Sequence, residues 1–125
     1  MSSPQNRPVF WIASSYDDWL AFPEEVQDVM GYALHLAQCG EKAPSAKPLA
    51  GFKGASVLEI CDDHAGDTYR AIYTVRFSEA VYVLHAFQKK SKKGIATPKS
   101  EIELIEQRLR KAKEHHDQHL SLIHI

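Results

Sequence analysis

The sequence predicts an α+β fold, a small and mostly antiparallel β-sheet with helices packed on one of its faces. Two runs rich in aromatic and β-branched residues, Tyr69–Phe77 and Val81–Phe87, are separated by a short turn and predict an antiparallel hairpin. Segments with apolar residues at helical spacing lie before and after this hairpin in the chain. The length of 125 residues suits one domain with its own core.

The first half of the chain predicts a strand followed by a helix. Pro8–Ala13 is a short apolar run of β-forming residues, and Ser15 is a candidate N-cap for a helical turn after it. Pro23 suits the first position of a longer helix, and Gly40 suits its end. The residues that share the expected apolar stripe are Val26, Val29, Met30, Ala33, Leu34 and Ala37.

The second half predicts three antiparallel strands and a last helix. A loop rich in Pro and Gly leads to a strand at Val57–Ile60, which a turn joins to the hairpin. Thr97 and Pro98 predict the start of the last helix, which we expect to end near Lys113. Its inward stripe is Ile102, Ile105, Leu109 and Ala112. The expected order is therefore strand, helix, three strands, helix.

The expected domain covers residues 8–113, between a flexible N-terminus (1–7) and a disordered tail (114–125). In that tail His115 and His119 are four residues apart, so metal ligation from one helix face is the less favoured alternative. Cys39 and Cys61 match no metal-binding spacing and predict reduced thiols. No apolar run approaches the ~20 residues that span a bilayer. We therefore expect a soluble cytoplasmic protein with no metal, no cofactor and no membrane partner.

The net charge of −1 conceals two oppositely charged regions. Residues 42–99 contain ten basic and five acidic side chains, whereas residues 1–41 contain one arginine and six acidic side chains. Four lysines follow the last strand closely: Lys89, Lys90, Lys92 and Lys93. Like charges repel, and Lys99 adds a cation at the positive end of a helix. This cluster predicts contact with a polyanion, with a solvated loop as the alternative.

Other candidates lie on neighbouring strands. Arg70 and Arg76 are six residues apart and should share a sheet face, although Arg70 could equally form a cross-strand pair with Glu59. His85 is expected on the face of Val81, Val83 and Phe87, where a core histidine is favoured over an acid–base group. Lys47 and Lys53 flank a Pro- and Gly-containing loop and could contact a phosphate.

An ordered set of motifs resembles the phage-related, HigB-type branch of the RelE-like toxins. The motifs are "KPLAGFKGASVLEI", "YRAIYTV" and "YVLHAFQKKSKKGIATPKSEIELIEQRL", and the resemblance covers roughly residues 8–113. The resemblance implies the toxin of a type II toxin–antitoxin pair, a metal-free, ribosome-dependent endoribonuclease that cuts mRNA through the substrate 2′-hydroxyl. Its implied partners are the ribosome, mRNA and a helix-turn-helix antitoxin.

The resemblance also implies site residues. Arg70, Lys89, Lys90 and His85 are the expected catalytic set. The expected RNA-binding set is Lys47, Lys53, Arg76, Phe87, Lys92, Lys93 and Lys99. The chain departs from the family pattern in its slightly acidic balance and in having no tyrosine after the last helix. Two alternatives therefore remain: a noncatalytic module that binds antitoxin or RNA, and a phage-derived factor that binds a host protein.

Overall fold

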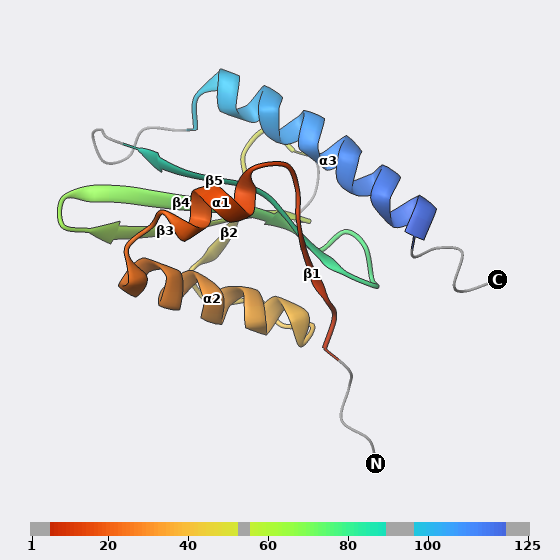
Figure 1. Ribbon diagram of the computed structural model, residues 1–125, viewed down its shortest axis with the longest axis horizontal. Helices are drawn as coiled ribbons and strands as arrows, with labels where there is room; N and C mark the ends of the chain where they lie inside the picture. Colours follow the sequence, from red (N-terminus) through yellow and green to blue (C-terminus); the bar gives the residue numbers. More distant parts are fainter. Residues whose placement is uncertain (1–5, 53–55, 90–96, 120–125) are drawn as a thin grey trace, which may run out of the picture.

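The computed structural model describes residues 6–52, 56–89 and 97–119, and within them a five-stranded sheet lies between helices (Figure 1). The elements are β1 (Val9–Trp11), α1 (Ser15–Leu20), α2 (Glu24–Gln38), β2 (Ala46–Pro48), β3 (Val57–His64), β4 (Asp67–Thr74), β5 (Val81–Lys89) and α3 (Lys99–His119). The strand order is β1-β5-β4-β3-β2, with β1 parallel to β5 and the other neighbours antiparallel. The predicted α+β class with a mostly antiparallel sheet is confirmed.

The α2 helix forms where the sequence predicts it. Glu24 and Glu25 lie in its first turn, where a carboxylate interacts favourably with the helix dipole. At the other end Gly40 adopts a φ of 83°, and two backbone bonds close the last turn, from Gly40 to the Ala37 carbonyl (3.0 Å) and from Glu41 to the Leu36 carbonyl (2.8 Å). This pair of bonds is a Schellman cap, which satisfies carbonyls that the helix leaves open.

The β3–β4 hairpin is longer than the sequence predicts. The predicted strand ends at Ile60, but β3 continues to His64 because its polar residues pair with β4. Thr68, for example, donates to the Asp63 carboxylate at 2.7 Å. The turn consists of Ala65 and Gly66, both with positive φ (52° and 89°), which matches the twist of a two-residue hairpin.

Helices cover both faces of the sheet, so the prediction of helices on one face is wrong. The α2 face carries one core cluster, to which Val26 and Met30 contribute. The opposite face carries a second cluster, in which Ile105 and Ala112 of α3 pack with Ile72 of β4. Because the central strands are apolar on both sides, both faces must be covered, and α3 covers the second one (Figure 1).

A β-bulge in β5 changes which side chains share a face. Ile72 pairs with His85 and Tyr73 pairs with Val83, so Leu84 is an extra residue in β5. As a result Leu84 and His85 both face α3, and the alternation shifts beyond them. His85 therefore lies on the face opposite Val83, which corrects the predicted shared face.

The α1 helix lies against β5 at the point where β1 ends. Ser14, not Ser15, precedes its first turn, and Ser15 is buried with its hydroxyl donating to the Val83 carbonyl at 3.2 Å. Since β1 pairs only with residues 81–83, the outer edge of β5 beyond Val83 faces α1 instead of another strand (Figure 1).

The α3 helix continues through His119, so the expected disorder of residues 114–119 is wrong. Two histidines dock its last turns on the sheet. His115 Nδ1 lies 2.7 Å from the Tyr82 hydroxyl, and the His116 ring stacks on Phe77 and pairs with Glu79. These contacts hold the last turns of α3, beyond Lys113, against the rest of the protein. The sequence did not predict these turns because they lack apolar residues at helical spacing.

Candidate functional site

Three of the four predicted catalytic residues, Arg70, Lys89 and His85, gather where β4 and β5 extend beyond the N-terminal end of α3. His85, Phe87 and Lys89 alternate along β5 and share the face on which Arg70 of β4 lies. Arg70 is paired directly with Phe87 in the strand register, and Lys89 is one alternation further along β5. The register therefore places an arginine, a lysine, an aromatic ring and an imidazole side by side.

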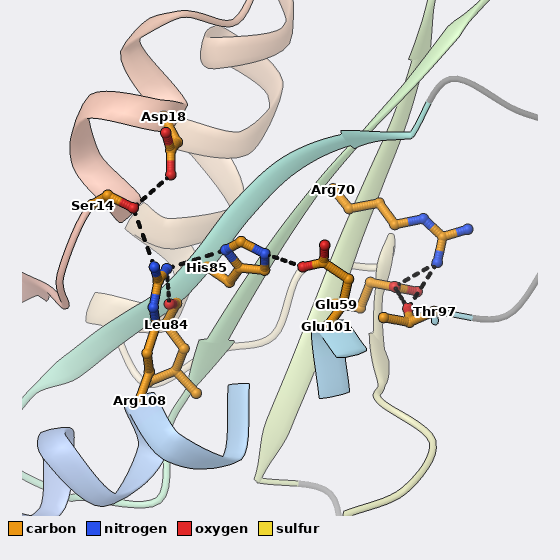
Figure 2. Close-up of polar contacts among 9 residues, drawn as sticks. All are labelled: Ser14, Asp18, Glu59, Arg70, Leu84, His85, Thr97, Glu101 and Arg108. Carbon is orange, nitrogen blue, oxygen red and sulfur yellow. Dashed lines mark hydrogen bonds and ion pairs between the residues drawn. The ribbon is translucent and has the colours of Figure 1, made fainter. Parts of the chain in front are cut away.

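Arg70 is held by Glu59 of β3 and by Thr97, which precedes α3 (Figure 2). Its Nη1 donates to the Glu59 carboxylate at 2.8 Å and to the Thr97 hydroxyl at 3.2 Å, and Thr97 donates to Glu59 at 3.2 Å. The Arg70 side chain is only 11% exposed and that of Glu59 16%. The alternative of a cross-strand pair with Glu59 is thus confirmed. Because this pair is largely buried, it fixes the direction of the guanidinium.

Lys89 is 9% exposed, which is unusual for a lysine. Burial lowers its pKa, and the nearby Arg70 cation lowers it further, while Glu59 and the Cys61 side chain act in the opposite direction. Such a lysine releases its proton more readily than a surface lysine does. Burial and Glu59 together raise the pKa of the Cys61 thiol to about 11, so at neutral pH this cysteine is a thiol and not a nucleophilic thiolate.

His85 is a buried histidine with partners on both ring nitrogens (Figure 2). Arg108 Nη1 lies 3.1 Å from Nδ1, and Nε2 contacts the Glu101 carboxylate. An arginine can only donate, so Nδ1 accepts and the ring proton lies on Nε2, from which it is donated to Glu101. Burial lowers the pKa of His85, an effect that Glu101 opposes and the Arg108 cation reinforces. The imidazole is therefore held neutral in one tautomer.

Arg108 is the residue of this network that the sequence analysis missed. It is 8% exposed and also donates to the Leu84 carbonyl (3.0 Å) and the Ser14 hydroxyl (3.2 Å), so it joins α3, β5 and the start of α1. The spacing of Arg108 in the sequence indicates that it is buried, because it lies three residues after Ile105 and four before Ala112, on the inward face of the helix. Buried arginines are rare without partners, which makes such a position informative.

A cavity of about 310 Å³ lies between α1 and the outer edge of β5. It is lined by Asp18, Ala21, Phe22, His85, Ala86, Phe87 and Gln88. The His85 and Phe87 rings stack with centroids 4.7 Å apart and an angle of 21° between their planes. The Ser14 hydroxyl donates to Asp18 at 2.8 Å, which extends the Arg108 network to the rim of the cavity (Figure 2).

The remaining predicted RNA-binding residues divide into three groups. Lys47 is exposed on β2 opposite Glu59, and Lys99 is exposed in the first turn of α3 near Thr97, so both flank the site. Arg76 lies beyond the other end of β4, six residues from Arg70, which corresponds to about 20 Å along a strand. The structure thus separates the two arginines. The others, Lys53, Lys92 and Lys93, fall outside the described residues, as does Lys90 of the predicted catalytic set.

The part of the chain that the structure describes contains no cluster of three His, Cys, Asp or Glu residues able to hold a metal ion. The rings of His115 and His119 stack at 4.4 Å on one face of α3, but no further ligand of these types joins them among those residues. No described helix is both long and apolar enough to cross a membrane.

The fold and site define a small α+β protein with cationic and titratable side chains clustered at one end of its central strands. Residues 17–110 match the phage-derived protein Gp49-like family, and the chain belongs to this family, a family of the RelE/HigB toxin type. A solved structure, the toxin–antitoxin complex RelBE2 from Mycobacterium tuberculosis, is similar with 16% identity and a TM-score of 0.45, covering 70% of this chain and 95% of that one. No curated protein matches the chain.

Proposed function

We propose that this protein is the toxin of a type II toxin–antitoxin pair and cleaves mRNA in a ribosome-dependent, metal-independent reaction. The observation that carries the proposal is the juxtaposition of Arg70 and the buried Lys89 beside Phe87 at one end of the sheet. Membership in a RelE/HigB-type family supports the same assignment. The proposed partners are the ribosome, mRNA and a helix-turn-helix antitoxin that masks this site.

The proposed reaction needs charge stabilisation and two proton transfers. The 2′-hydroxyl oxygen bonds to the adjacent phosphorus while the bond to the 5′-oxygen breaks, giving a cyclic phosphate and a free 5′-hydroxyl. Arg70 binds the phosphate oxygens, on which negative charge develops in the transition state. A guanidinium has five N–H donors, so Arg70 can hold Glu59 and a phosphate oxygen together. Lys89 lies beside it, where its neutral amine takes the proton of the 2′-hydroxyl and then returns it to the departing 5′-oxygen. Burial and the Arg70 cation lower the pKa of Lys89, which favours this exchange.

His85 has a supporting role in this proposal. Its Nε2 proton is engaged by Glu101 and its Nδ1 by Arg108, so it shapes the site and backs Phe87 instead of exchanging protons with RNA. This assignment differs from the expected catalytic role of His85. The test compares two variants: His85→Gln, which keeps a neutral polar side chain, should retain cleavage, whereas Lys89→Gln should lose it.

A noncatalytic binding module of the same fold is the second candidate. The observation that favours it is the engagement of Arg70 by Glu59 and of both His85 nitrogens, which suits a rigid binding surface as well as an active site. The two candidates differ in one measurable respect, since only a nuclease produces new RNA 5′ ends.

The test is a reconstituted translation reaction in which mRNA 5′ ends are mapped by primer extension. We expect ribosome-dependent cuts with the wild type and a loss of about 100-fold or more with Arg70→Ala, the size seen when one oxyanion donor is removed. Arg110→Ala is the matched control, since it removes an exposed arginine of α3 that belongs to neither predicted set and should leave cleavage unchanged. Circular dichroism of each variant verifies folding. If folded wild-type protein yields no cuts, the nuclease is refuted in favour of the binding module.

A further inference from the structure

The cavity between α1 and β5 has a size and a lining that the cleavage chemistry does not require. Its volume of about 310 Å³ is at the lower end of the range for ligand pockets, so it suits a small molecule. It opens at the edge of β5 that no strand of the described chain covers, beside Phe87. Phe87 lines the cavity and is paired with Arg70 in the strand register, so a nucleotide bound at Arg70 lies next to this cavity.

One wall of the cavity is suited to stacking. Phe87 is half-buried, and its ring packs on the nearly parallel His85 imidazole. His85 is itself fixed by Arg108 and Glu101, so the stack is held in place from behind. Flat aromatic surfaces of this kind bind the faces of unstacked RNA bases.

The opposite wall carries a carboxylate, Asp18, which only accepts hydrogen bonds when ionised. A carboxylate repels phosphate, so this part of the site is suited to the edge of a base and not to the RNA backbone. The Ser14 hydroxyl donates to one Asp18 oxygen, and Arg108 in turn donates to Ser14. Asp18 is thus oriented while its two oxygens keep further lone pairs for a ligand.

We propose that this cavity binds a guanine base of the RNA, with the base stacked on Phe87 and its edge bound by Asp18. The inference rests on the proposed function for the identity of the ligand as RNA. Guanine presents two adjacent donors, N1–H and the N2 amino group, which match the two oxygens of a carboxylate. Adenine and cytosine place an acceptor beside their donor, and uracil has a single donor between two acceptors, so each of these would direct an acceptor at Asp18.

The register links this base site to the phosphate site. Phe87 is directly opposite Arg70, and cross-strand neighbours in an antiparallel pair have Cβ atoms about 5 Å apart. A base on Phe87 therefore brings an adjoining phosphate towards Arg70 and Lys89. Asp18 selects the base, and Arg70 with Lys89 acts on the backbone, so specificity and chemistry reside in different side chains.

The test is a titration of the folded protein with the four nucleoside 3′-monophosphates, followed by NMR of the His85 and Phe87 side chains. All four ligands share the phosphate, so differences among them report on the base. We expect 3′-GMP to shift these signals and to bind about tenfold or more tightly than the other three, the discrimination typical of a bidentate side chain–base pair. Comparable binding of all four, or no shift at His85 and Phe87, would overturn the proposal.

Two variants sharpen the test. Asp18→Asn can still accept the hydrogen bond from Ser14 through its side-chain carbonyl, so the fold should be retained. It replaces the other carboxylate oxygen by an amide NH2 donor, so the preference for 3′-GMP should disappear. Asp17→Asn is the matched control, because Asp17 is an exposed carboxylate of the same helix that does not line the cavity. A guanine preference that survives Asp18→Asn would contradict the assignment of Asp18.

The titration is independent of the cleavage assay. Guanine binding without ribosome-dependent cuts would retain the base pocket and refute the nuclease. Cuts whose sequence preference is unaffected by Asp18→Asn would retain the nuclease and refute the pocket. The two proposals therefore fail separately.

Discussion

Replacing Arg108 by alanine should destabilise the protein strongly, because this one side chain joins three elements. Its guanidinium donates to the Leu84 carbonyl and Ser14 hydroxyl and contacts His85 Nδ1, at 3.0 to 3.2 Å. Ser14 is exposed and can bond to water instead, whereas the other two acceptors are buried. Each buried acceptor left unsatisfied costs about 1–3 kcal/mol, and the side chain also loses its packing, so we expect a loss of about 3–5 kcal/mol.

Urea denaturation measures this loss. With a slope of about 1–3 kcal/mol per molar urea for a small protein, the midpoint should fall by at least about 1 M. Arg110→Ala is the matched control, because Arg110 lies two residues further along α3 and is exposed, so its removal should change the stability by about 0.5 kcal/mol or less. If both variants lose the same small amount, Arg108 does not hold α1, β5 and α3 together, and the argument for a fixed His85 tautomer fails.

Two further predictions concern the second face of the sheet and the buried imidazole. Ile105→Ala should cost about 2–5 kcal/mol in urea denaturation because Ile105 is fully buried under α3, whereas the exposed Gln107→Ala should be near neutral; equal effects would show that α3 is not tightly docked. His85 has a lowered pKa in the folded state, so the unfolded chain binds its proton first as the pH falls. The contribution of the neutral His85 to the free energy of unfolding is therefore complete above about pH 6.5, the ordinary histidine pKa, and it is lost as the pH falls below that value. Stability measured from pH 7.5 to 5 should therefore decrease less in His85→Gln than in the wild type, and equal slopes would contradict the shift.

The predictable part of the fold is local. The turn residues and the apolar, β-branched runs of β4 and β5 predict the hairpin, and the spacing of Val26, Met30 and Ala33 predicts α2. Both signals depend on residues close together in the chain, where periodicity directly reports which side chains share a face. The same local reasoning predicted that cations follow the last strand and that Arg70 could pair with Glu59.

The arrangement of the site depends on contacts that no local pattern contains. The bulge at Leu84 breaks the period of two in β5, so His85 faces α3 although simple alternation places it with Val83. Arg108 contacts His85 although the two residues are 23 positions apart in the chain. Asp18, from the N-terminal part of the chain, lines the same cavity as His85.

The sequence alone therefore determined most of the elements, although not β2, which was expected to be a loop. It also determined the chemical types of the candidate residues and the family that the motifs resemble. Only the tertiary structure decided which of those residues meet. It brought Arg70, Phe87 and Lys89 together, separated Arg76 from them, and added Arg108 and Asp18. The physical reason is that propensity and periodicity act within an element, whereas the register, the bulge and the docking of α3 are fixed by packing between elements.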